Sequence, residues 1–415
     1  MLDGEELVVR EAHFAHSIGG DAAAREYYQQ ALAIQEKNAP NSLDIAMNLG
    51  NLGNLEGEHG DPKIAEEYLQ RAAAIFEKLS SDAINMASTF DDLGHLASEK
   101  GQLDLAKDYH LRALAIYEKQ APTSTELADT LRRLGTVAQL AGDLVEAESR
   151  YRRSLAVLEK AVGPDHAQVA EILKSLAELL GDKGETLEAL NDALRVEKIG
   201  RDHLRVVVRT LPEREGLLYA QARPVGLDLA LTLSAQGKVP NLWPEVGDAL
   251  VRSRAVVLDE MASRHHAVSG AEDPEIAQLA KKLTVARERL ARWVYRGPGD
   301  DSPEVYRDRL ERARKEKDRA EQTLAERSLP FREELAKTKE GLEEVARALP
   351  PGSALVAYAR CIRHQPARRL RPGEPKPALS ISYLASVLCF GTRQPAVSIP
   401  RQSRGLYHGW PLKGA

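Results

Sequence analysis

Apolar residues recur at helical spacing along the first half of the chain, and the whole pattern repeats. Four segments begin with glycine at residues 19, 60, 101 and 142 and read GGDAAAREYYQQALAIQEK, GDPKIAEEYLQRAAAIFEK, GQLDLAKDYHLRALAIYEK and GDLVEAESRYRRSLAVLEK. Successive copies start 41 residues apart. A fixed period of this length predicts a solenoid, in which each helical hairpin buries its apolar face against its neighbours.

Each glycine separates a first helix (helix A) from a second helix (helix B). Small residues recur at two positions around each glycine, so helices A and B are expected to approach closely there. Seven residues before the glycine they are Ala12, Gly53, Gly94, Gly135 and Ala177, and five residues after it they are Ala24, Ala65, Ala106, Ala147 and Ala189. Large apolar residues at helical spacing are expected to fill the space between them: Leu52, Leu93, Leu134, Ile34, Ile75, Ile116 and Val157. The turn glycines are expected in the left-handed region.

The Leu-Gly pair, with Ala twelve and Ala nineteen residues later, resembles the tetratricopeptide repeat (TPR). The long period and the connector GPDHAQVAEIL at 163–173 resemble the 42-residue subtype of kinesin light chains. The resemblance implies a right-handed superhelical array of about five helical hairpins over residues 1–200. The fifth copy loses the pattern after Ala189, which predicts the end of the array there. We expect further repeats upstream of Met1.

The resemblance also implies that the concave face, made by successive A helices, binds a peptide or partner protein. By position, that face is predicted to present Asn51, Asn54, Asp91, Asp92, His95, Arg132, Arg133 and Thr136. Asparagine can pair with a peptide backbone through both its donor and its acceptor. The acidic third and basic fourth repeats would select opposite charges in the ligand. The alternative is an ordinary solvated helix face on which Asp92 pairs with Arg133 of the next repeat.

Residues 201–345 lose the repeat but continue as helices. An amphipathic helix is predicted over 243–266, where adjacent His265 and His266 point about 100° apart and favour a surface pair over a metal site. Charged helices over 273–295 and 303–328 predict an antiparallel coiled-coil hairpin, a possible self-association element. Its facing residues would be Ile276, Leu279, Leu283 and Leu290 against Leu310, Ala313, Ala320 and Leu324.

Residues 346–415 change character, with strands predicted over 354–359 and 380–390 and a third over 394–399. This order of parts resembles bacterial proteins with a C-terminal CHAT (caspase-like) domain, here a small incomplete α/β segment. The dyad of that family is a His-Gly histidine followed by a cysteine. No cysteine follows His408-Gly409, so the chain is predicted to be non-catalytic. The alternative is a cysteine peptidase with Cys361 or Cys389 as nucleophile and His364 or His408 as base.

Composition narrows the function classes further. A net charge of −5 over 415 residues argues against nucleic acid as the main partner. The chain shows neither a signal peptide nor a run of 18 apolar residues, which predicts a cytoplasmic protein without membrane contact. Two cysteines without a CxxC or Cys/His cluster favour neither a disulfide framework nor a metal or cofactor site. The sequence therefore predicts a mainly α protein-interaction scaffold.

Overall fold

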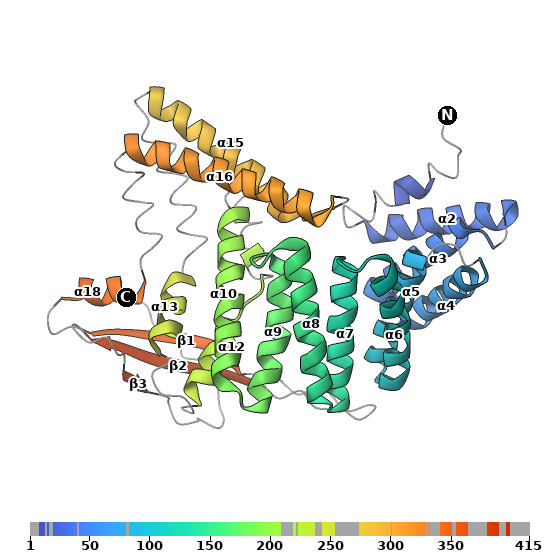
Figure 1. Cartoon of the computed structure of the whole chain (residues 1–415), viewed down its shortest axis with the longest axis horizontal. Helices are drawn as coiled ribbons and strands as arrows, with labels where there is room; N and C mark the ends of the chain where they lie inside the picture. The colour runs from blue at the N-terminus through green and yellow to red at the C-terminus, as the bar shows by residue number, and fades with distance from the viewer. Residues whose placement is uncertain are drawn as a thin grey trace, which may run out of the picture. The chain divides into compact units, whose positions relative to one another are not determined.

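The structure, a computed structural model, is shown in Figure 1. It describes residues 8–12, 15, 20–39, 41–79, 83–208, 219–220, 223–236, 243–253, 274–299, 301–328, 331, 341–350, 354–363, 380–389 and 396–398. The contacts divide the chain into two compact units. Among the described residues, the first unit holds those in Met1–Leu179 and Gly297–Asp308, and the second those in Leu180–Arg296 and Arg309–Gln365 together with the last two strands.

The first unit is a series of paired helices, as the 41-residue period predicted. Its B helices are α2 (Asp21–Asn38), α4 (Pro62–Leu79), α6 (Leu103–Gln120) and α8 (Leu144–Val162). Its A helices are α3 (Leu43–His59), α5 (Ala83–Glu99) and α7 (Thr125–Ala141), and α9 (Ala167–Lys183) follows at the fifth position. Each A helix packs against the B helix after it and the B helix before it. The first half of the chain is therefore an all-helical repeat array.

The close approach predicted at the small residues is present, and its cause is visible. A Cβ atom on Gly53 would lie 2.5 Å from Cγ of Leu69, and one on Gly135 would lie 2.7 Å from Cδ1 of Tyr151. A Cβ on Gly94 would lie 2.7 Å from Cε1 of His110. The three contacted residues occupy equivalent positions in α4, α6 and α8, so each glycine makes room for one large side chain of helix B.

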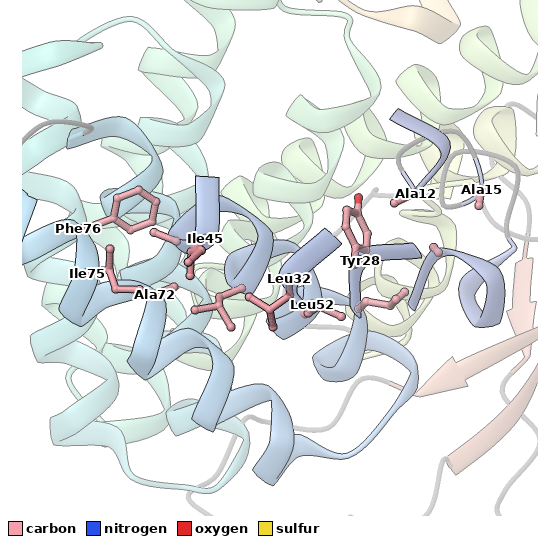
Figure 2. Packing of buried hydrophobic residues seen from close by; sticks show 13 residues of the cluster. Ala12, Ala15, Tyr28, Leu32, Ile45, Leu52, Ala72, Ile75 and Phe76 are labelled. Atoms are coloured by element: carbon pink, nitrogen blue, oxygen red, sulfur yellow. The ribbon is translucent and has the colours of Figure 1, made fainter. Parts of the chain in front are cut away.

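The apolar core continues from one repeat to the next. Figure 2 shows Tyr28 and Leu32 of α2, Ile45 and Leu52 of α3, and Ile75 and Phe76 of α4 in one cluster. Leu52, Leu93 and Leu134 are all buried, as predicted. Ile34, predicted to fill the same space, is 37% exposed, whereas the equivalent Ile75 of the next repeat is 5% exposed. Burying a Leu or Phe side chain contributes about 1.5–3 kcal/mol, so this shared core is the main stabilising feature of the array.

The turns between A and B helices are of two kinds. Gly101 and Gly142 have φ of +73° and +88°, the left-handed conformation that was predicted. The prediction is wrong for Gly60, whose φ is −131°. There the Glu56 carboxylate accepts a hydrogen bond from the Asp61 backbone nitrogen at 3.2 Å. A Cβ on Gly60 would lie only 1.8 Å from that carboxylate, so a larger residue would require the Glu56 side chain to move.

The second unit begins with α10 (Thr186–Val208) and continues with α12 (Leu227–Ala235) and α13 (Trp243–Ser253). The Glu197 carboxylate of α10 is fully buried. It accepts hydrogen bonds from Arg223 at 2.8 Å and from the Gly226 and Leu227 backbone nitrogens at 3.2 Å each. This one carboxylate fixes the start of α12 against α10. The rest of the helix predicted over 243–266, including both histidines, lies outside the described residues.

Helices α15 (Pro274–Arg296) and α16 (Pro303–Arg327) run side by side (Figure 1), close to the predicted bounds. Arg289 and Glu316 are 2.6 Å apart, and Arg287 and Glu321 are 3.0 Å apart. Later residues of α15 thus meet earlier residues of α16, as in an antiparallel hairpin. Among the predicted facing residues, Leu283, Leu290, Leu310, Ala313 and Leu324 are buried, whereas Ile276, Leu279 and Ala320 are partly exposed.

After α18 (Leu342–Ala348), the strands β1 (Ala354–Arg363), β2 (Ser380–Cys389) and β3 (Ala396–Ser398) form an antiparallel sheet in that order (Figure 1). They lie where the sequence predicted strands. Cys361 pairs with Ser382 in the ladder, and Cys389 pairs with Ala354. The two cysteines are therefore seven positions apart along β1. His364 and His408, the proposed bases of the peptidase alternative, lie outside the described residues.

Candidate partner-binding face

One stripe of each A helix carries six of the eight residues predicted to bind a partner, all except Asp91 and Arg132. It consists of four positions spaced by four, three and four residues, which share one side of a helix. We call this stripe the A face, and its members in α3, α5 and α7 are Met47, Asn51, Asn54 and Glu58; Ser88, Asp92, His95 and Glu99; and Asp129, Arg133, Thr136 and Leu140. Because α3 contacts α5 and α5 contacts α7, equivalent positions form rows across the repeats.

The exposure of the A face differs along the rows. Asn54 and His95 are exposed, as are Met47 and the acids Glu58 and Glu99. Asn51 is half-buried, and so are the Asp92, Arg133 and Thr136 side chains. The face therefore presents hydrogen-bonding groups to solvent over α3 and α5, while its α7 portion is more enclosed.

Asp92 is the most perturbed acid of the face. The pKa of its carboxyl is raised to about 7, chiefly by burial and to a smaller extent by the neighbouring Asp91 and Glu58 carboxylates. The Arg133 charge and a hydrogen bond from the Asn54 side chain act in the opposite direction. Asn54 and Asp92 belong to different repeats, so the structure joins two of the predicted binding residues directly.

The two predicted arginines are held by an aspartate that the sequence analysis did not single out. Nε and an NH2 nitrogen of Arg132 lie 2.9 and 2.5 Å from Oδ1 of Asp129, and Nε of Arg133 lies 2.6 Å from Oδ2. Burial alone would raise the pKa of the Asp129 carboxyl, but the two arginines hold it below its usual value. The spacing of three and four residues on one helix was the signal that could have identified this group.

These contacts change the charge pattern that was expected. The predicted basic fourth repeat contains its own counter-ion in Asp129. The alternative pairing of Asp92 with Arg133 is replaced by the Asp129 contact, although the Arg133 charge still acts on Asp92. The positive charges of Arg132 and Arg133 in the fourth repeat are thus neutralised by Asp129, whereas Asp92 in the third repeat has no such counter-ion in contact among the described residues.

Asp91 was predicted to line the binding face, but the structure places it in the interior, 8% exposed. Oδ1 of Asp91 lies 2.7 Å from Nδ1 of His110 on α6, and Oδ2 accepts a hydrogen bond from the Thr130 hydroxyl on α7. His110 itself is 1% exposed. Asp91 therefore connects three helices and is not available to a partner.

Thr136 belongs to a second polar network. Its hydroxyl lies 3.0 Å from the Tyr151 hydroxyl and 3.2 Å from the Arg132 carbonyl oxygen. The Tyr151 hydroxyl also donates to Oε1 of Gln139 at 3.0 Å. Thr136 thus holds the Tyr151 ring that packs on Gly135, so it connects the A face to helix B of the same repeat.

Other kinds of site find no support in the part of the chain that the structure describes. There, no three His, Cys, Asp or Glu side chains are placed to hold a metal ion. The helices described are likewise too short or too polar to cross a membrane.

Comparisons with known proteins agree with the repeat architecture. The family model described as tetratricopeptide repeat matches residues 10–78, 60–119 and 126–202. No curated protein matches the chain significantly. None of the comparisons identifies a catalytic domain or a caspase-like module, so the interpretation of residues 346–415 stays a prediction.

Several solved structures are similar to the chain at low identity. One is a putative kinesin light chain with nearly identical TPR-like repeats from Podosopora anserina, 20% identical, with a TM-score of 0.41, covering 48% of this chain and 97% of that one. BtubC (BKLC) from P. vanneervenii is 17% identical, with a TM-score of 0.40 and coverages of 64% and 94%. A Rap protein complexed with Competence and Sporulation Factor is 16% identical, with a TM-score of 0.45 and coverages of 77% and 78%.

Proposed function

We propose that this tetratricopeptide-repeat protein binds an extended segment of a partner protein along the A face and acts as a non-catalytic interaction scaffold. The observation that carries the proposal is the row arrangement. Asn51, Asn54 and His95 stand on two A helices in contact, and the Asn54 and His95 side chains are exposed to solvent. Solenoids use such extended surfaces, built from one stripe per repeat, to bind their partners.

The close packing of helices A and B behind these residues supports the same function. Leu69, His110 and Tyr151 pack directly on helix-A glycines, so the distance between the helices of each pair is fixed by side-chain contact. A surface that is ordered before binding loses less conformational entropy when the ligand arrives. We therefore expect the partner segment, rather than the array, to become ordered on binding.

The proposal assigns a separate role to each part of the chain. Residues 1–200 bind the partner, residues 201–345 connect, and the α15–α16 hairpin is the candidate for self-association. The caspase-like reading of residues 346–415 rests on the order of the parts. A peptidase would carry a cysteine thiolate that reacts with iodoacetamide well below pH 8, and ordinary slow alkylation of Cys361 and Cys389 would exclude it.

The binding test uses the full chain and a random 12-residue peptide library displayed on phage. The face variant carries Asn51→Ala, Asn54→Ala and His95→Ala. The control variant carries Glu67→Ala, Asp108→Ala and Ser149→Ala, three exposed and equivalent positions on the B helices. We expect the library to yield peptides that bind the wild type and the control and lose at least tenfold in affinity for the face variant. Equal binding by both variants would place the site elsewhere.

A further inference from the structure

We propose that the partner segment is basic, and that a lysine or arginine of this segment seats against Asp92 between α3 and α5. This inference rests on the proposed function, since it names the chemistry of the ligand that the A face takes. Three features support it: the charge of the two helices, the surroundings of Asp92, and the ion pairs already made by cations of the neighbouring segments.

The helices α3 and α5 carry an excess of acidic residues. Their sequences, LDIAMNLGNLGNLEGEH and AINMASTFDDLGHLASE, contain six acidic residues and neither lysine nor arginine. Asp44, Glu56 and Glu58 belong to α3, and Asp91, Asp92 and Glu99 belong to α5. Glu56 and Asp91 are buried and paired with Arg25 and His110, whereas Glu58 and Glu99 are exposed members of the A face. A segment lying across these helices would meet a field that favours cations.

The Asp92 carboxylate has a hydrogen-bond donor but lacks a counter-ion in contact. The Asn54 side chain of the preceding repeat donates to it. Among the described residues, no cationic nitrogen lies within ion-pairing distance of Asp92. A half-buried carboxylate of this kind is costly when charged, and a cation placed against it recovers that cost.

Three cations on, next to or in contact with α3, α5 and α7 are already bound to other carboxylates. Nε of Arg133 is held by Asp129 at 2.6 Å. Arg25 lies 2.6 Å from Glu56, and Lys100 lies 2.5 Å from Glu66. A cation of the ligand would therefore supply the counter-ion that the Asp92 carboxylate lacks. An acidic ligand would instead meet the Glu58, Asp92 and Glu99 carboxylates.

Binding of a cation must then be linked to the proton on Asp92. The pKa of this carboxyl is raised to about 7 before binding, and a cation in contact lowers it, so the ligand displaces the proton. Affinity should increase about tenfold from pH 6 to pH 8, the limit for one such proton. The groups that face Asp92 are Asn54 and Glu58 from α3, Asp91 from its own helix, Arg133 from α7 and Tyr117 from α6.

His95 is the histidine of the A face, and it lies one turn from Asp92 on α5. The variants Asp92→Asn and His95→Gln test the two side chains separately. Both side chains reach solvent. Asp92→Asn keeps the shape of the residue and His95→Gln keeps a polar side chain of similar length, so the fold should be retained. Circular dichroism and thermal unfolding of the full chain check this.

The experiment selects peptides from the phage-displayed 12-residue library against the full wild-type chain at pH 8, and measures their affinities at pH 6 and pH 8. We expect enrichment of Lys or Arg, an affinity at least fivefold lower for Asp92→Asn, loss of the pH dependence in Asp92→Asn, and its retention in His95→Gln.

Two results are distinct failures. Peptides without basic enrichment that still bind the A face would overturn this inference and leave the proposed function standing. No selectable peptide, or peptides indifferent to the face variant, would overturn the proposed function itself.

Discussion

The carboxylate of Asp91 and the imidazole of His110 face each other inside the array, with Oδ1 2.7 Å from Nδ1. Asp91 belongs to helix A and His110 to helix B of the same repeat, and the Thr130 hydroxyl of the next repeat donates to the same carboxylate. Equivalent positions in the second repeat hold Gly50 and Leu69. One repeat thus uses a buried polar junction where its neighbour uses apolar packing.

This substitution pattern gives a first prediction. Asp91→Ala leaves the buried His110 imidazole without its partner and should lower the free energy of unfolding by about 2–3 kcal/mol. The double variant Asp91→Ala/His110→Leu restores the apolar arrangement of the second repeat and should lose less than the single variant. Urea unfolding of the full chain measures both. A double variant that loses the sum of the two single losses would contradict the coupling.

A second prediction concerns two glycines of one helix. Gly53→Ala places a methyl group 2.5 Å from Cγ of Leu69 and should destabilise the array by about 1–3 kcal/mol. Gly50→Ala, one turn away, meets nothing nearer than 3.9 Å and should stabilise it by about 0.5–1 kcal/mol, as alanine does in a helix. Thermal unfolding should give shifts of opposite sign. Shifts of the same sign would show that helix approach does not select glycine at residue 53.

A third prediction follows from the raised pKa of Asp92. The folded state holds the proton of this carboxyl up to about pH 7, whereas the unfolded chain releases it near pH 4. Asp92 therefore lowers stability progressively as pH rises through that window. Asp92→Asn should be more stable than the wild type by about 1–2 kcal/mol at pH 8, with solvent screening included, and equal to it at pH 4.

The measurement for Asp92 is chemical denaturation of both proteins at pH 4, 5.5, 7 and 8. His95→Gln, one turn away on the same helix, is measured as the control. A stability difference for Asp92→Asn that is constant with pH would show that the carboxyl has an ordinary pKa.

A fourth prediction concerns the second unit. Glu197→Ala leaves the Arg223 guanidinium, itself largely buried, and two backbone nitrogens without their acceptor. The loss should be about 3–5 kcal/mol. Lys198→Ala, at the adjacent position, removes only an exposed pair with Asp202 and should cost less than about 0.5 kcal/mol. Similar losses for the two variants would contradict the anchoring role of Glu197.

The repeat architecture could be predicted from the sequence because its cause is local and recurs. Each Leu-Gly pair marks a place where a helix-B side chain needs room, and that requirement returns every 41 residues. The α15–α16 hairpin was predictable for a related reason, since its apolar spacing and its short loop leave one pairing. In both cases a neighbour in the chain supplies the packing surface.

The binding face was only partly predictable. Asp91 carries no sequence signal for burial, because aspartate is normally exposed and its equivalents in other repeats are Gly50 and Arg132. The unusual histidine at residue 110, where other repeats have Leu69 or Tyr151, was the available hint. The Glu197–Arg223 pair joins residues 26 positions apart without a repeat to mark them, so sequence spacing could not reveal it.

The central claim is that the A helices form the binding surface, and hydrogen–deuterium exchange of the full chain with and without a selected peptide tests it most directly. The account predicts slower exchange on binding in residues 43–59, 83–99 and 125–141, with residues 274–327 unchanged. Slower exchange confined to the B helices, or to the α15–α16 hairpin, would contradict it.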